Sequence, residues 1–191
     1  MKSAVPVLRL TEQEYLETER LSDVRREYLG GLVYAMAAAS ATHKLIGANL
    51  FSRLHAHLRD KPCQIFLSDM KVKIEATNTF YYPDVVVAFD PSDNAEYFRT
   101  KPVLIIEVAS PATAATDRRE KLLAYEKIPS LLEYVCVAQD EINVLVYRKA
   151  ENVHWWEETL VPDDVVELES VNLSVRLKDI YEGVPALTAR T

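Results

Sequence analysis

The sequence predicts an α/β protein built on a mixed β-sheet that is flanked by helices. Its 191 residues, 49% of them hydrophobic, suit one domain with a single sizeable core. Segments with helical periodicity alternate along the chain with segments that have the apolar or alternating pattern of strands. Only four glycines are present, which argues against flexible linkers. We therefore expect residues 1–191 to form one domain in the order helix, strands, helix, strands, helix, strands.

The N-terminal segment predicts a short helix followed by a hairpin. Thr11 and Glu14 have the spacing of a capping box, which opens a helix that continues to about Arg20. Residues 26–35 then read as two short strands that meet at Gly30-Gly31, a pair that tolerates positive φ angles.

A second helix is predicted from a cap at Ser40 or Thr42 to about Asp60. Its apolar residues recur every four positions, so they form one stripe along the helix. These residues are Ile46, Leu50, Leu54 and Leu58.

The remaining strands are predicted from apolar or alternating runs. They cover residues 64–68, 71–75, 81–89, 103–109, 133–138, 142–148 and 153–159. The runs 81–89 and 103–109 are almost wholly apolar, which is typical of strands that are buried on both faces. A third helix is expected over residues 116–127, ending near Pro129, and a last helical turn over residues 177–182.

The charge distribution disfavours a strong non-specific DNA binder. The net charge is -7, but residues 151–191 hold 3 Lys+Arg against 9 Asp+Glu, whereas residues 1–150 hold 19 and 20. Tight binding to nucleic acid usually needs a basic face, which this balance does not indicate. An enzyme that meets DNA transiently remains compatible with it.

We expect a cytoplasmic protein that does not span a membrane. The first ten residues do not fit a signal peptide, and no apolar run approaches the roughly 20 residues that cross a bilayer. Cys63 and Cys136 have no metal-binding spacing, and a reducing cytoplasm is the expected compartment. No fingerprint of a serine hydrolase, P-loop or dinucleotide-binding protein is present.

Two carboxylates in apolar surroundings indicate a site. Asp84 follows Pro83 and opens the run 85–89, and Glu107 lies inside the run 103–109. A charge in such a strand is costly unless it is compensated, and one divalent metal ion compensates two carboxylates at once. Mg²⁺ prefers one or two carboxylates together with waters and substrate phosphates. The alternative, in which Glu107 pairs with a buried Lys or Arg, is less favoured by the two strands alone.

Other polar residues carry weaker signals. Asp117, Lys121 and Tyr125 are spaced by four residues and so share one helix face, but the pattern alone favours a solvated Asp117–Lys121 pair. Glu27 alone is an ordinary half-exposed strand residue. His43 alone is best interpreted as a capping or packing residue.

Taken together, these residues resemble a known family. The segments YPDVVV at 82–87 and PVLIIEVASP at 102–111, followed by Asp117, Lys121 and Tyr125, are similar to the Uma-type putative endonucleases. This family belongs to the restriction-endonuclease-like PD-(D/E)XK superfamily. The resemblance runs from Leu10 to about Val184, and it includes His43 and the segments 27–31 and 128–134.

The resemblance implies a restriction-endonuclease-like fold and a set of site residues. Asp84 and Glu107 match the metal-binding positions, helped by the Val108 carbonyl, and Glu27 matches an additional acidic residue that would orient a water or a second ion. The superfamily motif has a lysine two residues after the glutamate, where this chain has Ala109. In the family a lysine of the following helix is thought to substitute, and Lys121 fits that place.

The implied activity is hydrolysis of DNA phosphodiester bonds with Mg²⁺ or Mn²⁺, in which Lys121 stabilises developing charge and His43 and Tyr125 contact the substrate. DNA would be a transient partner. A homodimer is expected because duplex cleavage needs two cuts, with Val144, Val146, Trp155 and Trp156 as candidate interface residues. Two alternatives remain: an inactive nuclease fold that serves as a binding or regulatory module, and a self-associating protein whose carboxylates only form ion pairs.

Overall fold

The computed structural model describes residues 9–110, 117–150 and 154–187, without the side chains of Asp117, Arg118 and Ala186. The predicted first residue of the third helix, 116, and the predicted start of a strand at 153 lie outside the described residues. Within the described residues, no helix is long and apolar enough to cross a membrane.

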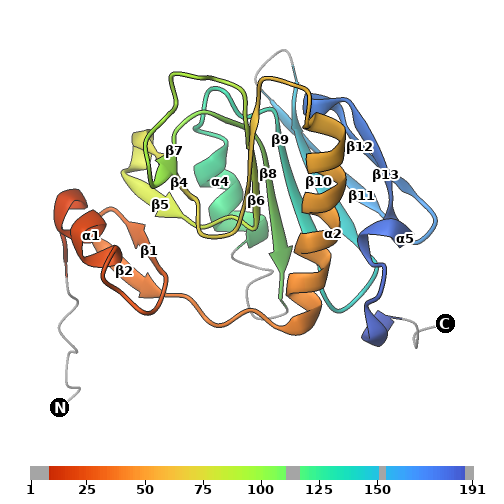
Figure 1. Cartoon of the computed structure of the whole chain (residues 1–191), viewed down its shortest axis with the longest axis horizontal. Helices are drawn as coiled ribbons and strands as arrows, with labels where there is room; N and C mark the ends of the chain where they lie inside the picture. The colour runs from red at the N-terminus through yellow and green to blue at the C-terminus, as the bar shows by residue number, and fades with distance from the viewer. Residues whose placement is uncertain (1–8, 111–116, 151–153, 188–191) are drawn as a thin grey trace.

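The central element is a six-stranded mixed sheet with the strand order β11-β10-β9-β8-β6-β3 (Figure 1). Its strands are β3 (Gln64–Leu67), β6 (Val85–Ala88), β8 (Pro102–Ala109), β9 (Glu133–Ala138), β10 (Val144–Lys149) and β11 (Trp155–Leu160). Neighbouring strands are antiparallel except β8 and β9, which are parallel.

A second sheet of five strands has the order β2-β1-β5-β4-β7. Its strands are β1 (Arg26–Leu29), β2 (Leu32–Ala35), β4 (Lys71–Ile74), β5 (Thr79–Tyr81) and β7 (Phe98–Arg99). A two-stranded hairpin of β12 (Val165–Leu168) and β13 (Leu173–Arg176) completes the described strands. We had expected one sheet and had not predicted β7, β12 or β13. β7 has only two residues and β12 and β13 have four each, which is too short to give a clear pattern.

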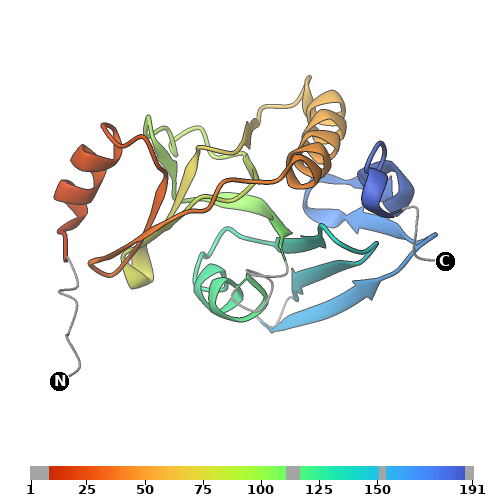
Figure 2. The same cartoon turned by 90° about the horizontal axis from the view of Figure 1, so that it is seen from below.

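Helices of the described chain cover both faces of the six-stranded sheet and, near the N-terminus, one face of the second sheet. They are α1 (Glu12–Glu19), α2 (Ala41–Leu58), a π-helical turn (Asp117–Lys121), α4 (Leu122–Tyr125) and α5 (Leu177–Ile180), with 3-10 turns at Glu75–Thr77, Glu169–Val171 and Pro185–Leu187. Figure 2 shows α2 and α5 on one side of this sheet and α4 on the other. The predicted mixed sheet flanked by helices is therefore confirmed.

Alternating residues of the central strands fill two cores. Val85, Leu104 and Ile106 pack against the stripe of α2, whose four predicted apolar residues are all buried. Val86 and Ile105 point the other way, towards α4 and the second sheet. This alternation is the expected consequence of the two-residue repeat of strands that are covered on both faces.

Local sequence signals also match the N-terminal elements. Thr11 caps α1 and forms the predicted capping box with Glu14, and Ser40, rather than Thr42, caps α2. Gly30 and Gly31 take φ angles of 55° and 106° in the hairpin turn between β1 and β2.

The predicted strand 81–89 is wrong in one respect, and this correction matters for the site. The run divides into β5 and β6, which belong to different sheets, and Asp84 stands at the bend just before β6. Pro83 has no N–H group to donate to a ladder, so the chain leaves the second sheet there and enters the central one. The third helix also differs from the prediction, because its residues Asp117–Lys121 form a π-helical turn.

Candidate active site

Strand pairing brings the two predicted metal-binding carboxylates together. Val85 of β6 pairs with Ile106 of β8 in an antiparallel register. Asp84, just before Val85, and Glu107, just after Ile106, therefore lie opposite each other. Oδ2 of Asp84 accepts a hydrogen bond of 2.7 Å from the backbone N–H of Val108. The Asp84 carboxylate is thus held directly against β8.

His43 approaches the same carboxylate from the other side. Its backbone N–H donates to the Ser40 cap at the start of α2, and its Nε2 lies 2.7 Å from Oδ1 of Asp84. The imidazole is 20% exposed, so part of it is open to the surface beside Asp84. The cap that we considered for His43 is made by Ser40, and the His43 side chain is a member of the site.

Glu107 is only 5% exposed and is held by two donors from the segment that follows β8. Its Oε1 lies 3.0 Å from Nζ of Lys121 and 2.9 Å from the hydroxyl of Tyr125. Nζ of Lys121 is also 3.3 Å from Oε1 of Glu27, which comes from β1 in the second sheet. Lys121 therefore links Glu27 and Glu107.

The interpretation of Lys121 as a solvated partner of Asp117 is wrong, because Lys121 is buried at 6% exposure. Lys121 ends the π-helical turn, a form that often marks functional sites in proteins. Its ammonium lies 5.4 Å from the centre of the Tyr81 ring, within the range of a cation–π contact.

Tyr125 is completely buried, so the substrate contact that we expected for it is not what the structure shows. Its hydroxyl donates to Glu107 instead. Burial, together with the negative charge of Glu107, raises the pKa of Tyr125 well above its ordinary value and keeps it a hydrogen-bond donor. Tyr125 thus fixes the orientation of Glu107.

Known proteins share this chain's sequence and fold. A family model described as Uma2, putative restriction endonuclease, matches residues 12–178. The chain belongs to this family. An uncharacterized protein of Synechocystis sp. (strain ATCC 27184 / PCC 6803 / Kazusa) is 34% identical over 182 residues, which cover 95% of this chain and 96% of the relative. A second uncharacterized protein of the same organism is 36% identical over 149 residues, 76% of this chain and 84% of the relative.

A solved structure supports the same fold. The crystal structure of a putative nuclease from Anabaena variabilis ATCC 29413 superposes with a TM-score of 0.73 at 20% identity, over 90% of this chain and 97% of that one. The resemblance to the Uma-type family and the restriction-endonuclease-like fold class are therefore confirmed. Family and fold together support a nuclease-like function.

The donors of this Uma2-family site fit a hard dication. Three carboxylates, Glu27, Asp84 and Glu107, lie around the ammonium of Lys121 and the imidazole of His43. Among these five side chains three carboxylates stand beside one ammonium, a set that favours a dication such as Mg²⁺ or Mn²⁺.

The number of protein ligands at such a site would be small. In the described part of the chain, no three His, Cys, Asp or Glu side chains gather in an arrangement that could hold a metal. A site of Asp84, Glu107 and the Val108 carbonyl would thus depend on waters and substrate phosphate for its other ligands, as Mg²⁺ sites commonly do. The roles of all three residues as ligands stay predictions.

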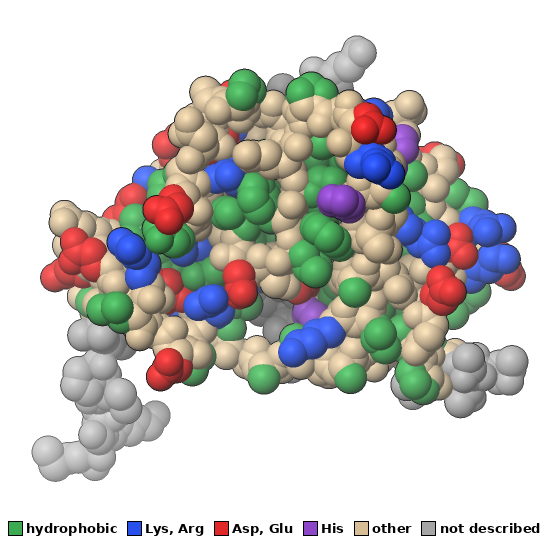
Figure 3. All heavy atoms as spheres, in the orientation of Figure 1, with side chains coloured by type: hydrophobic (Ala, Val, Ile, Leu, Met, Phe, Trp, Pro, Cys, Tyr) green, Lys and Arg blue, Asp and Glu red, His purple; other side chains and the backbone are tan. Residues whose placement is uncertain are grey.

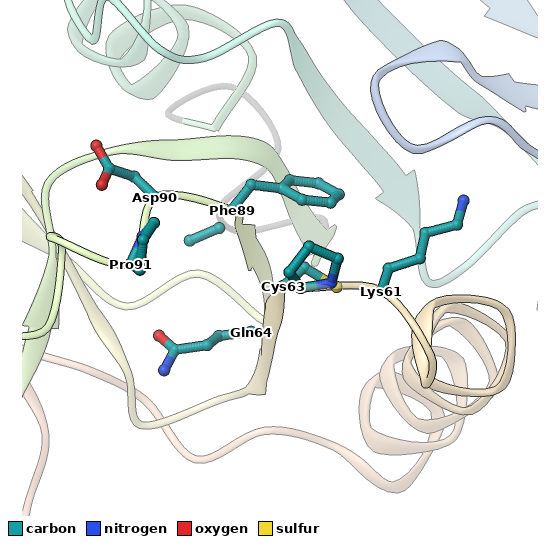
Figure 4. A pocket seen from close by; sticks show the side chains of 8 residues that line it. Lys61, Cys63, Gln64, Phe89, Asp90 and Pro91 are labelled. Atoms are coloured by element: carbon teal, nitrogen blue, oxygen red, sulfur yellow. The ribbon is translucent and has the colours of Figure 1, made fainter.

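A separate cavity lies away from this site. It has a volume of about 270 Å³ and is found at the opposite end of β6 from Asp84 (Figure 4). Its lining includes Lys61, Cys63, Gln64, Phe89, Asp90 and Pro91. Asp90 is paired with Lys101 Nζ at 2.7 Å, and burial raises the pKa of the Cys63 thiol, which disfavours the reactive thiolate. The cavity offers no group that is prepared for catalysis.

Sequence reasoning missed the surroundings of Glu27 and Asp84. Glu19, Lys71 and Tyr82 are all buried, and the Tyr82 hydroxyl contacts both of the others. Lys71, in the predicted strand 71–75, is only 4% exposed, which is rare for a lysine. The position of Tyr82, two residues before Asp84, was the one signal that could have drawn attention to this cluster.

Proposed function

We propose that this Uma2-family protein is a metal-dependent endonuclease that hydrolyses phosphodiester bonds in DNA. The observation that carries the proposal is the position of buried Lys121 between Glu27 and Glu107, next to the Asp84–Glu107 pair. This arrangement supplies two carboxylates for a metal, a third carboxylate beside them and a fixed positive charge. These charged groups would not favour the binding of an apolar ligand, but they suit metal-assisted chemistry at a phosphate.

Each residue of the site has a separate role in the proposed hydrolysis. When bound at Asp84 and Glu107, Mg²⁺ or Mn²⁺ would supply positive charge to the phosphate and increase the acidity of water. Tyr125 and the Val108 N–H hold the two carboxylates in place. Glu27 orients the attacking water, and Lys121 stabilises the negative charge that develops on the phosphate. His43, which is partly exposed beside Asp84, contacts the DNA.

The surface supports a transient encounter with DNA. Basic and acidic side chains are interspersed on the face shown in Figure 3 and are not gathered into one basic patch. Because a net charge of -7 repels the DNA backbone at long range, binding would depend on local contacts at the site and on salt concentration.

We also propose a cytoplasmic homodimer with one domain over residues 1–191. The interface that we expected needs revision, because Val144 and Val146 are fully buried in the core of one chain. Trp155 packs against the second core, and Trp156, on the edge strand β11, is 45% exposed. Light scattering at high micromolar concentration tests the dimer, and a monomer there would contradict it.

The alternative function is an inactive nuclease fold that binds or regulates. One observation favours it: Ala109 occupies the usual lysine position. The direct Lys121–Glu107 ion pair favours instead the other alternative, a self-associating protein whose carboxylates only form ion pairs. The pair is equally the geometry that a relocated catalytic lysine requires, and this is why we prefer the enzyme.

Nicking of supercoiled plasmid in Mg²⁺ or Mn²⁺ decides between the two functions. We expect the wild-type protein to nick and Asp84→Asn to lose nicking while melting within a few degrees of wild type. No nicking by the wild type in either metal, or undiminished nicking by purified Asp84→Asn, would overturn the proposed function.

A further inference from the structure

Glu19, the last residue of α1, is a buried carboxylate outside the site described above. It is only 2% exposed. Its Oε1 accepts hydrogen bonds of 2.9 Å from the backbone N–H of Arg26 and 2.9 Å from the hydroxyl of Tyr82, and its Oε2 accepts one of 2.8 Å from Nε of Arg26. A buried carboxylate persists only when it is bonded in this way, so these contacts form a fixed unit.

Both partners of Glu19 lie within two residues of the site, just before it in the sequence. Arg26 is followed by Glu27 on β1, and Tyr82 is followed by Pro83 and Asp84 in the crossing between the two sheets. One carboxylate thus joins the segment that carries Glu27 to the segment that carries Asp84, although the two are distant in sequence.

The strand ladder does not make this connection. The pairing of β1 with β5 consists of Tyr28 with Phe80 and Leu29 with Thr79, and it stops before Glu27. In the same register Arg26 would stand opposite Tyr82. At that point the Glu19 carboxylate bonds to both residues, so it takes the place of the missing ladder bonds next to Glu27.

Lys71 sets the direction of the Tyr82 hydroxyl. Its Nζ is 3.4 Å from the Tyr82 hydroxyl oxygen, and an ammonium can only donate. Because Tyr82 accepts from Lys71, its own proton goes to Glu19. The order of donors therefore runs from Lys71 of β4 through Tyr82 to Glu19 of α1.

We propose that Glu19, Tyr82 and Arg26 form a clamp. This clamp positions Glu27 relative to Asp84, Glu107 and Lys121. Glu19 and Tyr82 are positioning residues of the nuclease site: neither contacts the reacting atoms, and both act through the backbone beside Glu27. This inference rests on the proposed function for its catalytic consequence, whereas the clamp itself is a property of the fold.

Tyr82→Phe tests the clamp with Tyr181→Phe as a matched control. The change removes the hydroxyl and keeps the ring and the Glu19–Arg26 pair. Tyr181 is equally buried at 6% exposure, but its hydroxyl bonds to backbone groups: it donates to the carbonyl groups of Ala138 or Asn143 and accepts from the Asn143 N–H, remote from Glu27 and Lys121 in the described contacts. Each variant therefore loses one buried, hydrogen-bonded hydroxyl, and only Tyr82→Phe loosens the site.

Two readouts are needed: amide hydrogen exchange of β1, and plasmid nicking well below both melting temperatures. One lost hydrogen bond predicts about tenfold faster exchange at the amides of residues 26–28 in Tyr82→Phe. We expect kcat to fall by about the same factor with KM unchanged. Tyr181→Phe should change neither the exchange at residues 26–28 nor kcat, even if it lowers the melting temperature as much as Tyr82→Phe does.

Equal exchange at residues 26–28 in the two variants would overturn the clamp. Faster exchange with unchanged kcat would overturn its positioning role. If the wild-type protein does not nick DNA, the proposed function fails, and the exchange measurement still decides whether the clamp exists.

Discussion

The ammonium of Lys121 lies 3.0 Å from Oε1 of Glu107, although Glu107 is inside β8 and Lys121 ends the π-helical turn that follows it. The side chain of Ala109, at the usual lysine position, cannot supply such a charge. Lys121 reaches the same glutamate from outside the strand and also contacts Glu27. The ion pair accounts for how Glu107 remains buried, and it places a positive charge beside the proposed metal site.

Lys121→Met should reduce nicking by at least about a hundredfold, since one charge-stabilising group usually contributes this much or more. The variant should still bind Mn²⁺, because Lys121 is not a ligand. The matched control is Lys73→Met, which removes a lysine paired with Glu12 at 2.7 Å in another part of the second sheet. The relocated-lysine assignment fails if both variants nick at the wild-type rate.

Glu107→Gln should abolish nicking and weaken Mn²⁺ binding, because the amide replaces a charged ligand. Lys121 keeps Glu27 as a partner at 3.3 Å, so the loss of Glu107's charge does not leave the ammonium alone. We therefore expect cooperative unfolding close to that of the wild type. Isothermal titration with Mn²⁺ and a thermal melt check the two parts, and unchanged Mn²⁺ affinity would remove Glu107 from the ligand set.

Alkaline pH should destabilise the protein in part through Tyr81. Burial raises the pKa of Tyr81 to about 12, helped by the negative charge of Glu27, whereas an unfolded tyrosine titrates near pH 10. The folded state therefore keeps a proton that the unfolded state loses, and this contribution to stability is complete below pH 10 and is lost as pH rises towards 12. Urea unfolding at pH 8, 10 and 11 should show a shallower decline for Tyr81→Phe. An identical decline in both proteins would contradict the assignment.

The turn between β12 and β13 should favour Asn or Gly over other residues at position 172. This residue has φ 55° and ψ 53°, the left-handed conformation, and Asn78 adopts nearly the same one between β4 and β5. Asn172→Ala should lower the free energy of unfolding by about 1 kcal/mol, because Ala lacks the short polar side chain with which Asn tolerates the left-handed conformation, whereas Asn172→Gly should be close to neutral. Chemical denaturation of the two variants side by side checks this, and equal stability would show that the turn is not strained.

Much of the fold follows from local chemistry that is visible in the sequence. The capping box of Thr11 and Glu14 and the four-residue apolar repeat of α2 were predicted because a helix's own geometry requires them. Asp84 and Glu107 could also be identified from the sequence, because charged residues are rare in such apolar runs. This identification does not depend on how the strands pair.

The arrangement of the site depends on contacts between elements that no local pattern contains. The change of sheet at Pro83 places Asp84 at the start of β6, opposite Glu107, and the π-helical turn directs Lys121 inwards, where a regular helix pattern suggested a solvated residue. Lys71, in the predicted strand 71–75, is buried in the same way.

The sequence by itself determined which residues could carry chemistry and which faces would be buried, because both depend on residue type and on short-range periodicity. The tertiary structure alone decided which of them meet: Lys121 with Glu27 and Glu107, His43 with Asp84, and Tyr82 with Glu19. Strand order and the direction of the chain between sheets set those distances, and they follow from the packing of the whole molecule, since every strand buries its apolar side chains against several elements at once.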